Sequence, residues 1–97
     1  MMIEQNEVEK MSPNKLVSWF MISSYAYYRL SKPVMEDSTF DYLVQRLKAC
    51  YDEADHYHKK YITKDNLNAA TGFDIHYPNI VKCATASYLK ENNLWNS

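Results

Sequence analysis

The chain has 97 residues, enough for one hydrophobic core and too few for two, and its 46% apolar and 14% aromatic content favours a folded domain over a disordered chain. Its formal net charge of −1, from 11 basic and 12 acidic residues, argues against a chain-wide phosphate-binding field and so disfavours nucleic acid as a partner. The chain has a single glycine, which excludes glycine-rich phosphate loops, so a conventional nucleotide-dependent enzyme is not expected. The two cysteines, Cys50 and Cys83, match neither a disulfide framework nor a zinc pattern.

The first eleven residues are mostly polar, and residues 1–11 are predicted to form a polar N-terminal tail or a short helix that packs weakly. The segment Met1–Gln5 lacks the basic-then-apolar order of a signal peptide, so a cytoplasmic location is expected. No apolar run approaches the roughly 18 residues of a transmembrane helix, so no membrane association is predicted.

The first long helix is predicted from Ser12 and Pro13, because serine suits the N-cap and proline suits the first helical position. Apolar side chains then recur at spacings of three and four residues. Pro33 disfavours a helical residue before it, so the helix is expected to end near Leu30 or Ser31.

A second helix is predicted after the short connection 32–36. Asp37 or Ser38 would be its N-cap, and with Ser38 as the cap, Asp41 would complete a variant of the capping box. Apolar residues keep helical spacing as far as Tyr61, over about five turns. Two long helices joined by a short connection are expected to lie antiparallel, as a hairpin.

The rest of the chain is predicted to add a short helix within Thr63–Gly72 and a last helix opened by Pro78. Leu94 and Trp95 could fold back on the core. The predicted fold class is therefore all-α: an antiparallel helical hairpin plus one or two additional packed helices, in a single helical domain spanning 12–97.

Aromatic and acidic residues gather on the two sides of the hairpin turn. Tyr27 and Tyr28 close the first helix, while Asp37 and Asp41 open the second and share a face. Aromatic faces stack on a planar cationic ring, and carboxylates accept hydrogen bonds from sugar hydroxyls, which together suit a nucleoside with a cationic base. The alternative interpretation is that the tyrosines belong to the core and the aspartates complement the helix dipole.

This segment resembles a known family. The residues that carry the resemblance are Tyr27, Tyr28, Pro33, Asp37, Phe40, Asp41 and Leu43. They look like the ordered pattern Tyr-Tyr/His, Pro, Asp-x-x-Tyr-Asp-x-Leu of the N-terminal helical hairpin (the Ia-type, NMN-recognition domain) of NAD⁺-dependent bacterial DNA ligases. The resemblance covers roughly residues 14 to 66, with Ile62-Thr63-Lys64-Asp65 similar to a segment after the family's second helix, and it fades beyond Gly72.

The resemblance implies a ligand and roles for these residues. Tyr27 and Tyr28 would face the nicotinamide of NMN or NAD⁺, and Asp37 and Asp41 would hold the ribose. Phe40 stands where the family has tyrosine, so the hydroxyl contact is lost at that position. The sequence leaves open whether the site is still functional, or filled by a side chain such as Met35 or Trp95.

The catalytic parts of a ligase are missing from this sequence. No lysine is followed by x-Asp-Gly, the nucleophile motif of the family's adenylation domain. The chain therefore resembles a stand-alone copy of the recognition hairpin (12–61) followed by its own helices (62–97), and we expect a module that is not an enzyme. Alone it would offer half a site, so weak binding is expected unless a partner or a second copy completes the pocket.

Other interpretations start from different residues. His56 and His58 lie in an acidic stretch that could hold a metal ion, although a solvated helix face is the simpler account and no metal site is predicted. A basic strip around Lys59 and Lys60 could meet nucleic acid, but the nearby acidic residues favour a solvated surface.

A second functional hypothesis is a small protein-interaction or inhibitor protein that keeps the hairpin as a scaffold. The chain has nine tyrosines and two tryptophans, more aromatic side chains than so short a core should easily bury, and aromatic residues are enriched at interfaces. Compact single-domain chains of this kind are often phage accessory proteins. Self-association into a homo-oligomer is compatible with both hypotheses.

Overall fold

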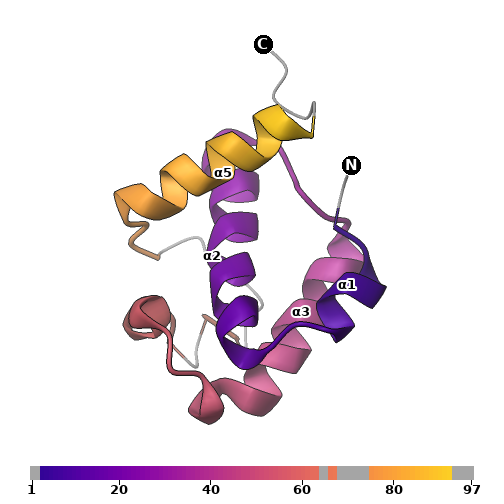
Figure 1. Ribbon diagram of the computed structural model, residues 1–97, viewed down its shortest axis with the longest axis vertical. Helices are drawn as coiled ribbons and strands as arrows, with labels where there is room; N and C mark the ends of the chain where they lie inside the picture. Colours follow the sequence, from indigo (N-terminus) through magenta and orange to yellow (C-terminus); the bar gives the residue numbers. More distant parts are fainter. Residues whose placement is uncertain (1–2, 64–65, 68–74, 93–97) are drawn as a thin grey trace.

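The protein is an all-α domain in a computed structural model that describes residues 3–63, 66–67 and 75–92. In chain order it contains α1 (Gln5–Glu9), α2 (Pro13–Leu30), α3 (Asp37–Cys50), the 3₁₀ turns η1 (Tyr51–Glu53) and η2 (Tyr57–Tyr61), and α5 (Asn79–Glu91). Helix α2 lies at the centre and contacts both α3 and α5, while α1 packs on α3 (Figure 1). The predicted fold class is confirmed.

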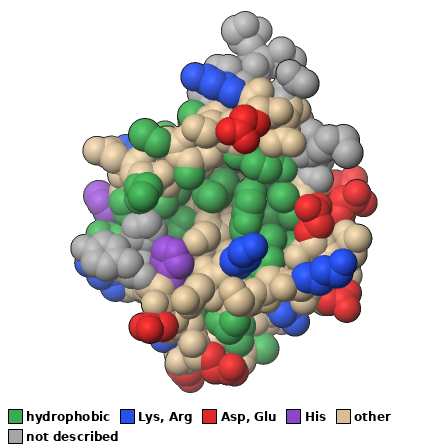
Figure 2. Space-filling model, in the orientation of Figure 1, with side chains coloured by type: hydrophobic (Ala, Val, Ile, Leu, Met, Phe, Trp, Pro, Cys, Tyr) green, Lys and Arg blue, Asp and Glu red, His purple; other side chains and the backbone are tan. Residues whose placement is uncertain are grey.

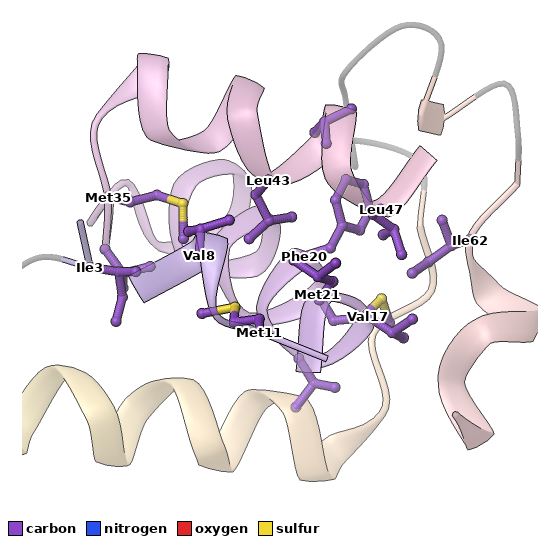
Figure 3. Close-up of a cluster of buried hydrophobic side chains, with 14 of the residues drawn as sticks. Ile3, Val8, Met11, Val17, Phe20, Met21, Met35, Leu43, Leu47 and Ile62 are labelled. Carbon is purple, nitrogen blue, oxygen red and sulfur yellow. The ribbon is translucent and has the colours of Figure 1, made fainter. Parts of the chain in front are cut away.

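Helix α2 follows its predicted boundaries. The Ser12 hydroxyl accepts a hydrogen bond from the Lys15 N–H at 3.3 Å, and Pro13 is the first helical residue. The buried face of α2 supplies much of the core; its buried residues are Leu16, Val17, Phe20, Met21, Ser23, Ser24 and Ala26. Figure 3 shows Phe20 of α2 beside Leu43 and Leu47, which are buried residues of α3.

The end of α2 depends on one left-handed residue. Ser31 has φ 55° and ψ 35°, and the N–H groups of Ser31 and Lys32 both point back to the Ala26 carbonyl. This conformation satisfies a carbonyl of the last turn and redirects the chain into the connection, but it places a Cβ where glycine is preferred.

We therefore expect Ser31→Gly to stabilise the protein by about 0.5 kcal/mol, because removal of the Cβ strain outweighs the added freedom of the unfolded chain. Urea denaturation would measure the change. Ser12→Gly at the other end of α2 is the matched control, and it should destabilise the protein by about a few tenths of a kcal/mol, because glycine is itself tolerated at the N-cap. If both substitutions destabilise the protein, the account of Ser31 fails.

Helix α1 packs more firmly than the sequence analysis predicted. Val8 is fully buried, and Ile3 and Met11 on either side of it are buried as well. The Glu7 carboxylate accepts a hydrogen bond from the Glu4 N–H at 2.9 Å and fixes the first turn. The expectation of weak packing is wrong because these three apolar side chains all reach the core of the domain (Figure 3).

Helix α3 begins one or two residues earlier than predicted, depending on which of the two predicted caps is taken, and ends much sooner. Its N-cap is Glu36, whose side chain makes no capping hydrogen bond, so neither Asp37 nor Ser38 is the cap and the predicted capping box is absent. The Ile3 N–H donates to the Val34 carbonyl at 2.8 Å, and Ile3 and Met35 form an isolated β-bridge. This tertiary contact keeps the chain extended up to Glu36 and so sets the start of the helix.

The second predicted helix does not continue to Tyr61. It ends at Cys50, and the chain turns through η1 and η2. Hydrogen bonds to α2 replace the missing helical ones: the Asp55 N–H donates to Asn14 Oδ1 at 2.7 Å, and His56 Nε2 lies 2.8 Å from Ser18 Oγ. The apolar periodicity there reflects side chains that reach the core from 3₁₀ turns, not from one continuous helix.

The C-terminal helix starts as predicted, with Pro78 at the N-cap of α5. Of the short helix predicted within Thr63–Gly72, only Thr63, Asn66 and Leu67 are described; Asn66 and Leu67 are helical, and the rest lies outside the described residues. The suggestion that Leu94 and Trp95 fold back also lies outside them. No helix among the described residues is long and apolar enough to cross a membrane.

Candidate functional site

A pocket of about 210 Å³ lies where the second half of α2, the connection after it and the first turns of α3 meet. Its lining residues are Ser23, Ser24, Tyr27, Tyr28, Pro33, Val34, Met35, Asp37, Phe40 and Asp41. All five candidate residues from the sequence analysis (Tyr27, Tyr28, Asp37, Phe40 and Asp41) are in this set. The turn between the helices therefore brings them together around one cavity.

The aromatic part of the pocket comes from both helices. The rings of Tyr27 and Tyr28 meet edge to face, with centroids 4.9 Å apart and an interplanar angle of 83°. Tyr27 is 53% exposed, so part of its ring is open to a ligand. Phe40 is half-buried and stacks on the buried Phe20 at 5.7 Å, which fixes its ring as a wall of the pocket.

The two aspartates lie at the exposed rim. Asp37 is the first residue of α3, and Asp41 follows one turn later on the same face. Among the described residues, neither carboxylate makes a hydrogen bond or an ion pair with another side chain. Both are therefore free to accept hydrogen bonds from a ligand.

Two serines of α2 line the pocket one turn before the tyrosines, and the sequence analysis did not assign them to the site. The Ser23 hydroxyl donates to the Trp19 carbonyl and lies 3.9 Å from the Met35 sulfur. Ser24 is fully buried, and its oxygen has no partner at hydrogen-bonding geometry. Their spacing of four from Tyr27 and Tyr28 is the sequence signal that could have found them.

Tyr77 packs behind this part of α2. Its ring lies 5.3 Å from the Tyr25 ring in a T-shaped pair, and the Arg29 guanidinium carbon is 5.3 Å from its centroid. Burial raises the pKa of Tyr77 to about 12, and the nearby Ser24 hydroxyl and Arg29 charge oppose that rise. Ser24 is thus close enough to influence the phenol without making a well-directed hydrogen bond to it.

The acidic stretch around His56 was the other group of residues considered as a site, in that case for a metal ion. No group of three His, Cys, Asp or Glu residues that could hold a metal ion is found in the described part of the chain. His56 instead contacts Ser18, a serine–histidine pair that the residue order did not suggest. Neither residue lines the pocket of the candidate site, and the pair ties the segment after α3 to α2.

Three basic residues of this region contact neighbouring groups. Lys59 lies over the Tyr51 ring at 4.8 Å, Lys60 lies over the Tyr61 ring at 5.4 Å, and Arg46 of α3 donates to the Met11 carbonyl at 3.2 Å. On the face shown in Figure 2, Lys and Arg side chains are interspersed with acidic ones.

The comparisons with known proteins add no support to the resemblance to the ligase hairpin. No protein-family model, curated protein or solved structure matches this chain.

Proposed function

We propose that this protein is a non-catalytic module that binds a nicotinamide nucleotide, NMN or the NMN half of NAD⁺, in the pocket between α2 and α3. One observation carries the proposal: the five residues that resemble the recognition hairpin of NAD⁺-dependent DNA ligases all line one cavity. Tyr27 keeps 53% of its surface exposed, so the ring that the resemblance assigns to nicotinamide is accessible to a ligand.

The chemistry of the pocket supports this ligand class. A planar nicotinamide cation gains about 0.5–1 kcal/mol by stacking on an exposed aromatic face such as that of Tyr27. The carboxylates of Asp37 and Asp41, which pair with no described side chain, can accept hydrogen bonds from the ribose hydroxyls. At about 210 Å³ the cavity is smaller than a typical pocket for a whole drug-sized ligand, roughly 300–1,000 Å³. Binding would therefore hold part of the nucleotide and be weak unless a partner or a second copy covers the rest.

The two carboxylates provide the test. We expect Asp37→Ala with Asp41→Ala to weaken NMN binding at least tenfold, because a hydrogen bond to a charged group is worth about 1.5–3 kcal/mol. Amide chemical shifts followed by NMR during a titration with NMN would measure the affinity. In the wild type the shifts should saturate and cluster around Tyr27, Tyr28 and the start of α3.

A matched control separates the site from the overall charge. Asp52 and Asp55 are exposed aspartates on the segment after α3, outside the pocket, and replacing both with alanine changes the net charge equally. This control should leave NMN binding unchanged, and both double variants should keep the helical circular dichroism signal. Undiminished binding by the Asp37/Asp41 variant, or the absence of shifts in the wild type at millimolar NMN, would contradict the proposal.

The second hypothesis, a protein-interaction or inhibitor protein, has a narrower basis in the structure. Within the described ranges, the large exposed apolar side chains are Tyr27, which belongs to the pocket, and Ile80 on α5, which is 66% exposed. Most of the other described aromatic rings pack against the core, including Trp19, which meets Tyr88 edge to face at 5.1 Å. The outer face of α5 around Ile80 is therefore the surface where such a partner would be sought.

A further inference from the structure

The pocket between α2 and α3 is acidic. Its charged lining residues are Asp37 and Asp41, and no Lys or Arg lines it in the part of the chain that the structure describes. Because neither carboxylate has a partner among those residues, no described ion pair neutralises their charges. A ligand in this pocket therefore meets two negatively charged groups at the rim.

The start of α3 does not offer a separate site for an anion. A helix N-terminus can bind a phosphate through its free N–H groups. Here the first turn carries Asp37 next to the N-cap Glu36, and both side chains are exposed. Their carboxylates complement the helix dipole themselves, so an anion approaching the same N–H groups is repelled.

The interior of the pocket has a different character from the rim. Val34 and Met35 are buried, and Phe40 of α3 adds an aromatic wall. The lining thus suits a planar ring inside and a sugar at the acidic rim.

We infer that the pocket selects a positively charged N-ribosyl pyridinium without a phosphate, of the kind represented by nicotinamide riboside, over its 5′-phosphate NMN. This inference rests on the proposed nicotinamide site and adds a charge preference to it. A phosphate carries about −1.5 to −2 charges at pH 7, so phosphorylation turns a cationic ligand into a net anion. The attraction of Asp37 and Asp41 for the ring is then opposed by their repulsion of the phosphate.

The test compares four ligands by the same NMR titration: nicotinamide riboside, NMN, neutral nicotinamide, and reduced nicotinamide riboside, whose ring is uncharged. One exposed ion pair changes affinity by a factor of about 1.4 to 5, so with two carboxylates we expect nicotinamide riboside to bind about threefold to tenfold tighter than NMN. The reduced riboside should bind more weakly than the oxidised one by a similar factor. Raising the salt concentration should shrink both differences, because exposed charges are screened.

Isosteric neutral variants complete the experiment. Asp37→Asn with Asp41→Asn keeps the shape of the rim and should remove the preference for nicotinamide riboside over NMN, while Asp52→Asn with Asp55→Asn should keep it. If NMN binds as tightly as nicotinamide riboside or tighter, or if the reduced riboside binds equally well, the charge preference is overturned while the nicotinamide site stands. If none of the four ligands shifts the pocket resonances, the proposed function itself fails.

Discussion

Phe20→Ala is expected to destabilise the protein by about 3–5 kcal/mol, the usual cost of replacing a buried phenylalanine with alanine. Phe20 is fully buried on the central helix α2, and its ring stacks on Phe40 with an interplanar angle of 20°. Small domains are stable by only about 5–15 kcal/mol, so this loss leaves a large unfolded fraction. The same change removes the support behind Phe40, a wall of the candidate pocket.

Chemical denaturation followed by circular dichroism measures this effect. Phe20→Leu is the matched control, since it keeps most of the apolar volume and should cost about 1.5 kcal/mol or less. A loss below about 1 kcal/mol for Phe20→Ala would mean that the ring does not occupy a tightly packed core.

Val8→Asp is expected to cost about 3 kcal/mol, because it places a carboxylate in the core, where a fully buried apolar side chain stands. The loss is limited by the free energy with which α1 docks on α3, since the helix can detach and expose the new charge. A large effect would establish that this five-residue helix belongs to the cooperative core. The measurement is the midpoint and slope of urea denaturation.

The control for this substitution lies on the same helix. Asn6 is exposed, so Asn6→Asp adds the same charge to α1 without burying it and should change stability by less than about 0.5 kcal/mol. Equal and small effects at Asn6 and Val8 would show that α1 contributes little, as the sequence analysis had predicted.

The sequence predicted elements well where local signals determine them. Ser12 and Pro13 set the start of α2, and Pro78 sets the start of α5. It failed where distant contacts decide: the helix after the turn stops at Cys50 because the following residues bond to α2 through Asn14 and Ser18. The spacing of apolar residues shows which side chains reach the core. A run of 3₁₀ turns can produce nearly the same spacing as an α-helix, so the spacing alone does not distinguish the two.

The candidate site likewise has a part that the sequence predicted and a part that it did not. Its aromatic and acidic residues were predicted because they flank one turn between two helices, and a short turn between helices forces them together. The spacing of Ser24 from Tyr28 could have placed it at the pocket, but its burial without a partner could not be predicted, because that depends on what packs against the helix. The start of α3 at Glu36 was missed for a similar reason, since a contact with Ile3 determines it.

That contact has a consequence for the entropy of binding. Val34 and Met35 line the pocket, and the chain around them is held in place by the hydrogen bond from Ile3 and by the β-bridge between Ile3 and Met35. A loop that must be ordered by its ligand reduces the affinity by the conformational freedom it loses. Here the N-terminal segment has already ordered this side of the pocket during folding, so a ligand entering it meets a preorganised wall.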